Sequence, residues 1–134
     1  MKPILYLSID FPSAPRSAML SSSTTTSLSI YWQRPSSLGG GNLQGYRVGY
    51  RRRNLPFEYR YTQSTQITLS NLLDDTEYII EVRASNDAGY GPSNTITVRT
   101  TKPGITYFKS ILVEYINSIN IVKRSFLVKN KLMK

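Results

Sequence analysis

Apolar side chains recur at every second residue in several short segments of the chain. In the longest segment the apolar positions are Tyr78, Ile80, Val82 and Ala84. Charged side chains fill most of the positions between them, and Ile79 is the apolar exception. Alternation with a period of two predicts a β-strand that buries one face and exposes the other.

Six more segments show the same alternation and are separated by turn-forming residues. They cover residues 18–20, 28–32, 46–50, 58–61, 67–69 and 96–98. Stretches rich in Gly, Pro, Ser, Thr, Asn or Asp lie between them, among them 21–27, 34–41 and 86–91. Such stretches favour turns and loops. Seven short strands with turns between them predict an all-β, antiparallel two-sheet sandwich of the immunoglobulin-like type.

The inward positions of these strands define the expected hydrophobic core. Trp32 should lie at its centre, because an indole buries more area than any other side chain present. The other residues expected in the core are Tyr46, Val48, Leu72, Tyr78, Val82 and Ala84. The spacing of Leu72, Thr76 and Tyr78 also resembles a tyrosine corner, in which a buried Tyr hydroxyl bonds to backbone a few residues upstream.

Positions spread over about residues 12–102 together resemble the fibronectin type III family. In the first half the matching residues are Pro15, Leu28, Ile30, Trp32, Pro35, Gly45, Tyr46, Val48 and Tyr50. In the second half they are Leu72, Thr76, Tyr78, Val82, Ala84, Asn86, Gly89, Gly91 and Ser93. Asp74 departs from the family pattern, which often has Pro there. The resemblance implies a seven-stranded sandwich that serves as a protein-interaction or spacer module.

Residues on either side of this segment differ from it in composition. We expect residues 1–11 to be an N-terminal extension and residues 103–134 to be a basic C-terminal tail. Of the net charge of +9, residues 103–134 contribute six Lys and Arg against one acidic residue. Apolar residues of the tail recur at three- and four-residue steps: Phe108, Leu112, Tyr115, Ile119, Val122 and Phe126. This spacing predicts a helix, although β-branched runs leave a disordered tail as the alternative.

The chain offers little chemistry for catalysis, so we expect no enzyme and no cofactor. It contains no His and no Cys, which removes the usual general base, the usual zinc ligands and any disulfide. Asp74 and Asp75 are adjacent and lie at a turn, where acidic side chains are normally solvated. The glycines at 39–41 are not followed by the Lys and Ser or Thr of a phosphate-binding loop.

Five arginines are predicted to lie on one outward sheet face: Arg47, Arg51, Arg53, Arg83 and Arg99. The family template places the strands that carry them side by side. This face could bind a polyanion such as a sulfated glycan, or an acidic partner. The alternative is a solvated charged face with cross-strand pairs, because Glu77 and Glu81 share it.

The resemblance is compatible with more than one kind of parent protein and cellular compartment. The first hypothesis is a fragment of a cell-adhesion or receptor-like protein that contacts other proteins, with its parent at the cell surface. The second is an intracellular structural module of a cytoskeletal or muscle-type protein, because neither a signal peptide nor a membrane span is visible. Nucleic acid is not an expected partner, because no recognised platform of aromatic and basic residues is present.

Overall fold

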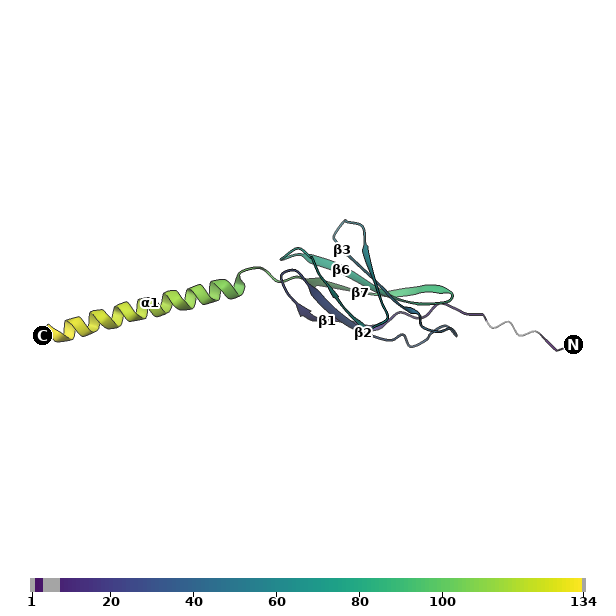
Figure 1. Cartoon of the computed structure of the whole chain (residues 1–134), viewed down its shortest axis with the longest axis horizontal. Coiled ribbons are helices and arrows are strands. Elements are labelled where there is room, and N and C mark those ends of the chain that lie inside the picture. The colour runs from purple at the N-terminus through teal and green to yellow at the C-terminus, as the bar shows by residue number, and fades with distance from the viewer. Residues whose placement is uncertain (1, 4–7, 134) are drawn as a thin grey trace. The chain divides into compact units, whose positions relative to one another are not determined.

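The computed structural model describes residues 2–3 and 8–133 of the chain, without the side chains of residues 105–110. Seven strands form the predicted sandwich: β1 (Arg16–Ser23), β2 (Leu28–Gln33), β3 (Gly45–Arg52), β4 (Glu58–Thr62), β5 (Gln66–Leu69), β6 (Glu77–Asn86) and β7 (Gly89–Arg99). They build a three-stranded sheet in the order β1-β2-β5 and a four-stranded sheet in the order β4-β3-β6-β7. All pairs are antiparallel (Figure 1). The predicted fold class is confirmed.

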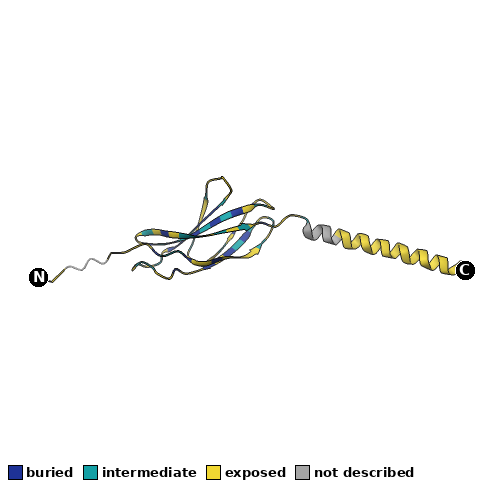
Figure 2. Ribbon diagram, turned by 180° about the vertical axis from the view of Figure 1, so that it is seen from behind, coloured by how far each residue is buried: buried dark blue, intermediate teal, exposed yellow. Residues whose placement is uncertain are grey.

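The core lies between the two sheets and follows from the period of two. In β6 every second residue from Tyr78 to Asn86 is buried, and the residues between them are at least partly accessible. Figure 2 shows this alternation as buried positions along the strands of the sandwich. The residues expected in the core are each at most 6% exposed, and Leu28, Ile30, Tyr50, Leu69 and Ile80 are buried with them.

Trp32 joins the two sheets through an aromatic contact. Its ring meets the ring of Tyr46 edge to face, with 5.2 Å between centroids and an interplanar angle of 69°. The indole Nε1 of Trp32 and the hydroxyl of Tyr46 are buried without a hydrogen-bond partner among the described residues. Burial of the two rings and their edge-to-face geometry therefore stabilise this contact.

The structure corrects the expected extent of two loops. Residues 86–91 were predicted to form a loop, but β6 continues to Asn86 and β7 begins at Gly89. The tight turn is possible because the Ala88 N–H donates to Asn86 Oδ1 at 2.9 Å, while Gly89 adopts a φ of +125°, which only glycine takes up easily. Similarly, residues 21–23 belong to β1, and the turn is closed by the N–H of Thr24 donating to the Ser27 carbonyl at 2.9 Å.

The buried side chain of Asn86 ties the N-terminal segment to the sandwich. Its Nδ2 donates to the carbonyl of Asp10 at 2.7 Å and to that of Leu38 at 2.8 Å. Pro12 passes so close to Gly91 that a Cβ on Gly91 would lie 1.9 Å from the Pro12 carbonyl oxygen. The packed part of the chain therefore begins near Asp10, inside the expected extension of residues 1–11.

The C-terminal unit of the chain, Lys102–Lys134, contains one helix, α1 (Ile105–Leu132). Of the two alternatives for the tail, the structure shows the helix. α1 begins after Gly104, whose φ is +81° and which provides no side-chain cap. Within the residues that the structure describes, no helical segment has the length and hydrophobicity that a membrane span requires.

Trp32 and Tyr31 offer a matched test of the core, since they are adjacent in β2. Tyr31 is 40% exposed and Trp32 is 2% exposed. Trp32→Ala should lower the free energy of unfolding by about 3–5 kcal/mol, because it removes a large buried ring and leaves a cavity. Tyr31→Ala should change it by about 0.5 kcal/mol. Urea titration of both variants measures the difference, and similar losses for the two would contradict the position of Trp32.

Candidate interaction face of the four-stranded sheet

Arginine and aromatic side chains come together on the outward face of the four-stranded sheet. In β3 the residues Tyr46, Val48 and Tyr50 are buried, so Arg47 and Arg51 lie on the opposite face. The guanidinium carbon of Arg47 lies 4.7 Å from the ring centroid of Tyr59 and 4.3 Å from that of Tyr90. Arg47 is thus held between a ring of β4 and a ring of β7.

Arg51 makes a similar contact four residues further along β3. Its guanidinium carbon lies 4.8 Å from the ring centroid of Phe57, and the rings of Phe57 and Tyr59 stack with centroids 6.0 Å apart. We call this set, Arg47, Arg51, Phe57, Tyr59 and Tyr90, the Arg–aromatic face. Each cation–π contact of this kind is worth roughly 0.5–2 kcal/mol, more where water is excluded.

Gly49 makes room for the rings. It lies between Arg47 and Arg51 in β3, and a Cβ there would lie 2.9 Å from Tyr59 and 3.1 Å from Phe57. Any side chain at this position would push both rings away from the sheet. The lack of a side chain at Gly49 therefore allows the rings of Phe57, just before β4, and Tyr59, in β4, to lie over the centre of β3.

The Nε atoms of Arg47 and Arg51 are buried and have no hydrogen-bond partner among the residues that the structure describes. A charged group that leaves water needs compensation. Here the faces of the aromatic rings supply it for both guanidinium groups. The two arginines are consequently fixed in place and partly removed from solvent.

Arg83 lies directly opposite Arg47 in the β3–β6 register. Two like charges in this position repel, and the neighbouring carboxylate of Glu81 offsets the repulsion. Arg83 Nη2 lies 3.4 Å from Glu81 Oε2, and its Nη1 donates to the Gly91 carbonyl at 3.2 Å. The guanidinium group of Arg83 is therefore already paired.

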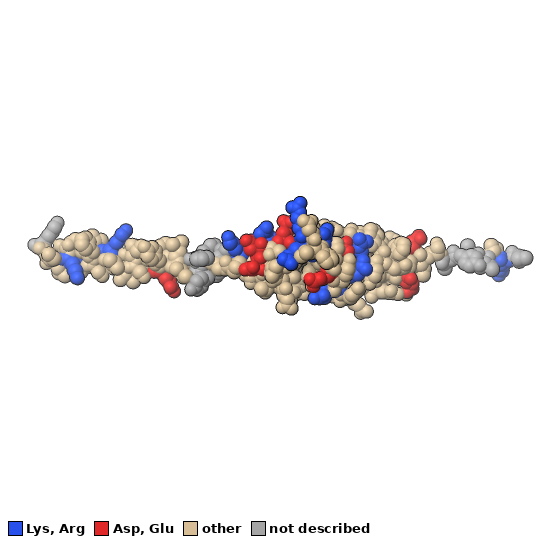
Figure 3. Space-filling model, turned by 90° about the horizontal axis from the view of Figure 1, so that it is seen from above, with Lys and Arg blue, Asp and Glu red and all other residues tan. Residues whose placement is uncertain are grey.

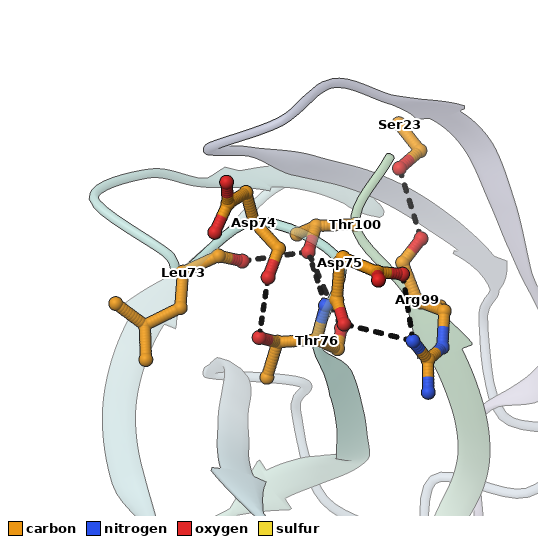
Figure 4. A network of polar contacts seen from close by, with 7 residues as sticks. All are labelled: Ser23, Leu73, Asp74, Asp75, Thr76, Arg99 and Thr100. Carbon is orange, nitrogen blue, oxygen red and sulfur yellow. Dashed lines mark hydrogen bonds and ion pairs between the residues drawn. The ribbon is translucent and has the colours of Figure 1, made fainter. Parts of the chain in front are cut away.

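Arg99 belongs to a separate polar network at the end of β7, drawn in Figure 4. Its Nη1 donates to the Asp75 carboxylate at 2.7 Å and to the Asp75 carbonyl at 2.8 Å. The buried hydroxyl of Thr100 donates to the Leu73 carbonyl at 2.6 Å and accepts from the Thr76 N–H at 3.0 Å. Arg99 and Thr100 thereby fix the turn that precedes β6.

The same turn contains the tyrosine-corner contact. The Leu73 N–H donates to the hydroxyl of Tyr78 at 2.9 Å, so the bond reaches five residues upstream. Asp74 stands where the family pattern often has Pro, and its carbonyl accepts a bond from the Thr76 hydroxyl at 2.6 Å. A side-chain hydrogen bond thus holds the turn at the position of the missing proline.

Of the five arginines expected on this face, the structure brings three together. Arg47, Arg51 and Arg83 lie on the adjacent strands β3 and β6, whereas Arg53 follows the end of β3 and is exposed. Arg99 lies opposite Glu77 at the strand end. The aromatic members Phe57, Tyr59 and Tyr90 were missed, although residues 57, 59 and 61 of the sequence are aromatic at every second position.

A hollow lies beside the edge strand β4 and has a volume of about 440 Å³. Its lining includes Tyr50, Glu58 and Arg60. The Tyr50 hydroxyl donates to Glu58 at 2.9 Å, and the Arg60 guanidinium lies over the Tyr50 ring at 5.5 Å. Charged side chains that point inward on an edge strand discourage pairing with another chain, and Glu58 and Arg60, which lie opposite the buried Tyr50 and Val48, are of this kind.

The fold and the exposed face define an immunoglobulin-like β-sandwich domain with a polar and aromatic outer surface. The family model described as "Fibronectin type III domain" matches residues 13–100. The chain belongs to the fibronectin type III family.

Known relatives come from different kinds of protein. The chain is 33% identical to "Protein sidekick-1" of Gallus gallus over 119 residues, which are 82% of this chain and 6% of that protein. It is 35% identical to "Myosin-binding protein H" of Mus musculus over 87 residues, which are 62% of this chain and 18% of that protein. It is 30% identical to "Cell adhesion molecule DSCAM" of Gallus gallus over 96 residues, which are 65% of this chain and 5% of that protein.

A solved structure of titin domains A168–A170 superposes with a TM-score of 0.64 at 25% identity. The match covers 69% of this chain and 33% of that one. The chain spans no more than 10% of the length of the first curated relatives that it matches. The relatives thus include adhesion and receptor-type proteins as well as muscle proteins.

Two buried tyrosines predict a loss of stability at alkaline pH. Burial raises the pKa of Tyr46, and burial together with the hydrogen bond to Glu58 raises the pKa of Tyr50. A raised pKa means that the folded state holds the phenol proton more tightly than the unfolded state. The resulting stability is fully present below the unfolded value of about 10 and is lost as the pH rises through the folded pKa.

The variant Tyr46→Phe/Tyr50→Phe should therefore lose less stability above about pH 10 than the parent. A matched control is Tyr31→Phe/Tyr61→Phe, because these two side chains are exposed. Urea titration between about pH 8 and pH 11 measures the slope of stability against pH. Equal slopes for the two double variants would show that the buried phenols do not cause the alkaline loss.

Proposed function

We propose that this domain is a non-catalytic protein-interaction module of a cell-adhesion or receptor-like protein, and that it contacts its partner through the Arg–aromatic face. The observation that carries the proposal is the guanidinium group of Arg47 held between the rings of Tyr59 and Tyr90. Tyr and Arg, together with Trp, are enriched in the binding hot spots of protein interfaces.

The accessibility of the face supports this role. Tyr59 is 38% exposed, Tyr90 is 39% exposed and the neighbouring Tyr61 is 67% exposed. Part of each of these side chains is thus available for contact with a partner. Because the contacts with Arg47 already fix two of the rings, a partner would lose little side-chain entropy in binding them.

The composition supports a non-catalytic role. The sequence contains neither His nor Cys, which are the most common general base and the strongest side-chain nucleophile. The described contacts of the face are cation–π pairs, stacked rings and one ion pair, and these suit recognition better than bond breaking.

An intracellular structural module is the second candidate. The similarity to "Myosin-binding protein H" and to titin domains favours it. The similarity to "Cell adhesion molecule DSCAM" favours the first candidate. Both candidates use the same kind of protein contact, so the compartment of the partner distinguishes them.

Binding of a sulfated glycan through the arginine face is a third candidate, and the paired state of the arginines weighs against it. Arg83 is engaged by Glu81, Arg99 is engaged by Asp75, and ring faces cover the guanidinium group of Arg47. A sulfate group would compete with a carboxylate or a ring at each of them. Exposed Arg53 is left as a ready donor.

The proposal is tested with arrays of purified cell-surface ectodomains and of purified cytoskeletal and muscle proteins, probed with the full chain at about 0.15 M salt. We expect binding to an ectodomain that falls about 30-fold or more in Tyr59→Ala/Tyr90→Ala, because hot-spot residues contribute about 2 kcal/mol or more. The matched control Tyr31→Ala removes an exposed tyrosine from the other sheet and should leave the affinity unchanged.

Three other results would favour a different candidate function or a different contact surface. Binding only to cytoskeletal or muscle proteins would replace the first candidate by the second. A partner lost in Tyr31→Ala but retained in Tyr59→Ala/Tyr90→Ala would show that the Arg–aromatic face is not the contact surface. Retention on heparin that is stronger than any protein binding and is abolished by Arg52→Gln/Arg53→Gln would favour the glycan.

A further inference from the structure

The helix α1, taken by itself, presents an apolar stripe along one side. The stripe consists of Leu112, Tyr115, Ile119, Val122 and Phe126, which recur at steps of three and four residues. These side chains are between 36% and 68% exposed, and every described side chain of residues 111–133 is exposed (Figure 2). A surface of this kind normally marks a binding site.

The residues of α1 indicate that the helix depends on covering this stripe. Ile and Val recur through residues 111–128, and Asn117 and Asn120 interrupt its middle. These residue types have lower helix propensity than Ala, Leu or Lys. The first turn has no side-chain cap and no acidic residue. Most helical stability in such a segment comes from burial of one face.

The charged side chains of α1 are mostly positive and lie both beside the stripe and opposite it. Lys123 and Lys129 flank the stripe, whereas Arg124 and Lys131 lie on the opposite side of the helix together with the apolar Ile121 and Val128. Residues 111–133 carry Lys123, Arg124, Lys129 and Lys131 against the single acidic residue Glu114. Figure 3 shows basic side chains toward the C-terminal end of the helix, with uncharged surface between them.

These charges favour a lipid surface over a second copy of α1 as the binding partner of the stripe. If two α1 helices met along the stripe, Lys129, three residues after Phe126, would lie in the contact between them. Two parallel copies would also bring their basic ends together, and the charges would repel. On a lipid surface the long Lys129 stem can lie along the apolar region while its ammonium group reaches the headgroups.

We propose that α1 binds the surface of an anionic lipid bilayer and lies parallel to it, with the apolar stripe at the boundary between headgroups and acyl chains. A helix with a continuous apolar stripe, basic side chains beside it and bulky side chains such as Phe and Leu has the chemistry for this location. Lys123 and Lys129, which flank the stripe, would contact acidic headgroups. The stripe runs along the helix, so the parallel orientation brings its whole length to the boundary, while Arg124 and Lys131 on the opposite side stay in water.

The test is flotation of the full chain with vesicles of phosphatidylcholine alone or with about a fifth of phosphatidylserine, which models an anionic leaflet. Binding is expected with phosphatidylserine and should weaken as salt rises, because surface charges are screened. Lys123→Gln/Lys129→Gln should weaken it about 30-fold. The control Arg52→Gln/Arg53→Gln removes the same charge from the sandwich and should change binding by about twofold or less.

A second pair of variants tests the apolar stripe. Val122→Asn/Phe126→Asn should abolish vesicle binding. Ile121→Asn/Leu127→Asn, which changes two exposed apolar residues away from the stripe, should retain most of it. The thermal unfolding of the sandwich, followed by the fluorescence of Trp32, shows that each variant is otherwise folded.

Several outcomes would overturn the proposal. Equal flotation with neutral and anionic vesicles, or none with either, would exclude the anionic surface. Equal losses of vesicle binding in the two asparagine variants would exclude the stripe as the membrane-binding surface. A dimer in sedimentation equilibrium without lipid that Val122→Asn/Phe126→Asn dissociates, together with no flotation, would show that a second copy covers the stripe.

Discussion

The register between β3 and β6 is the constraint on which both faces of the four-stranded sheet depend. It places Tyr46 opposite Ala84, Val48 opposite Val82 and Tyr50 opposite Ile80, all inside the sandwich. A slip of one residue in β3 would turn its buried side chains outward and its arginines into the core. The hydrophobic core and the Arg–aromatic face are therefore set by the same pairing, and neither can change without the other.

The outer face then takes its form from a single small residue. Gly49 leaves room above β3, and the rings of Phe57 and Tyr59 occupy it. Tyr90, which follows the tight turn between β6 and β7, reaches Arg47 from the other side. Three strands thus contribute to one ordered surface, although none of them carries a motif that specifies it alone.

The sequence was sufficient to predict the sandwich because its strands alternate with period two and its turns are well marked. Trp32 and Tyr78 lie where the pattern puts them, and the hydroxyl of Tyr78 bonds to the Leu73 backbone as a tyrosine corner requires. The arginines of β3 could likewise be placed outward by parity alone. Local patterns were therefore sufficient to predict the individual strands and the face to which their side chains point.

Contacts between distant residues could not be predicted in this way. The pairing of Arg47 with Tyr90 depends on the register of β6 with β7 and on the length of the turn between them, which the glycines at 89 and 91 made look like a long loop. The bond from Asn86 to Asp10 joins residues 76 positions apart. The ion pairs of Arg83 and Arg99 also make the basic face less available to a polyanion than its number of arginines suggests. A charge count does not show which charges are already paired.

The central claim is that Arg47 is held between Tyr59 and Tyr90 before any partner binds. The most direct measurement is the NMR signal of its side-chain Nε–H in the free, nitrogen-15-labelled chain. A proton near aromatic ring faces should shift upfield and exchange slowly with water, and the shift should disappear in Tyr59→Leu/Tyr90→Leu. An Arg47 signal that coincides with those of the exposed Arg52 and Arg53 in the parent chain would show that the face is not preorganised.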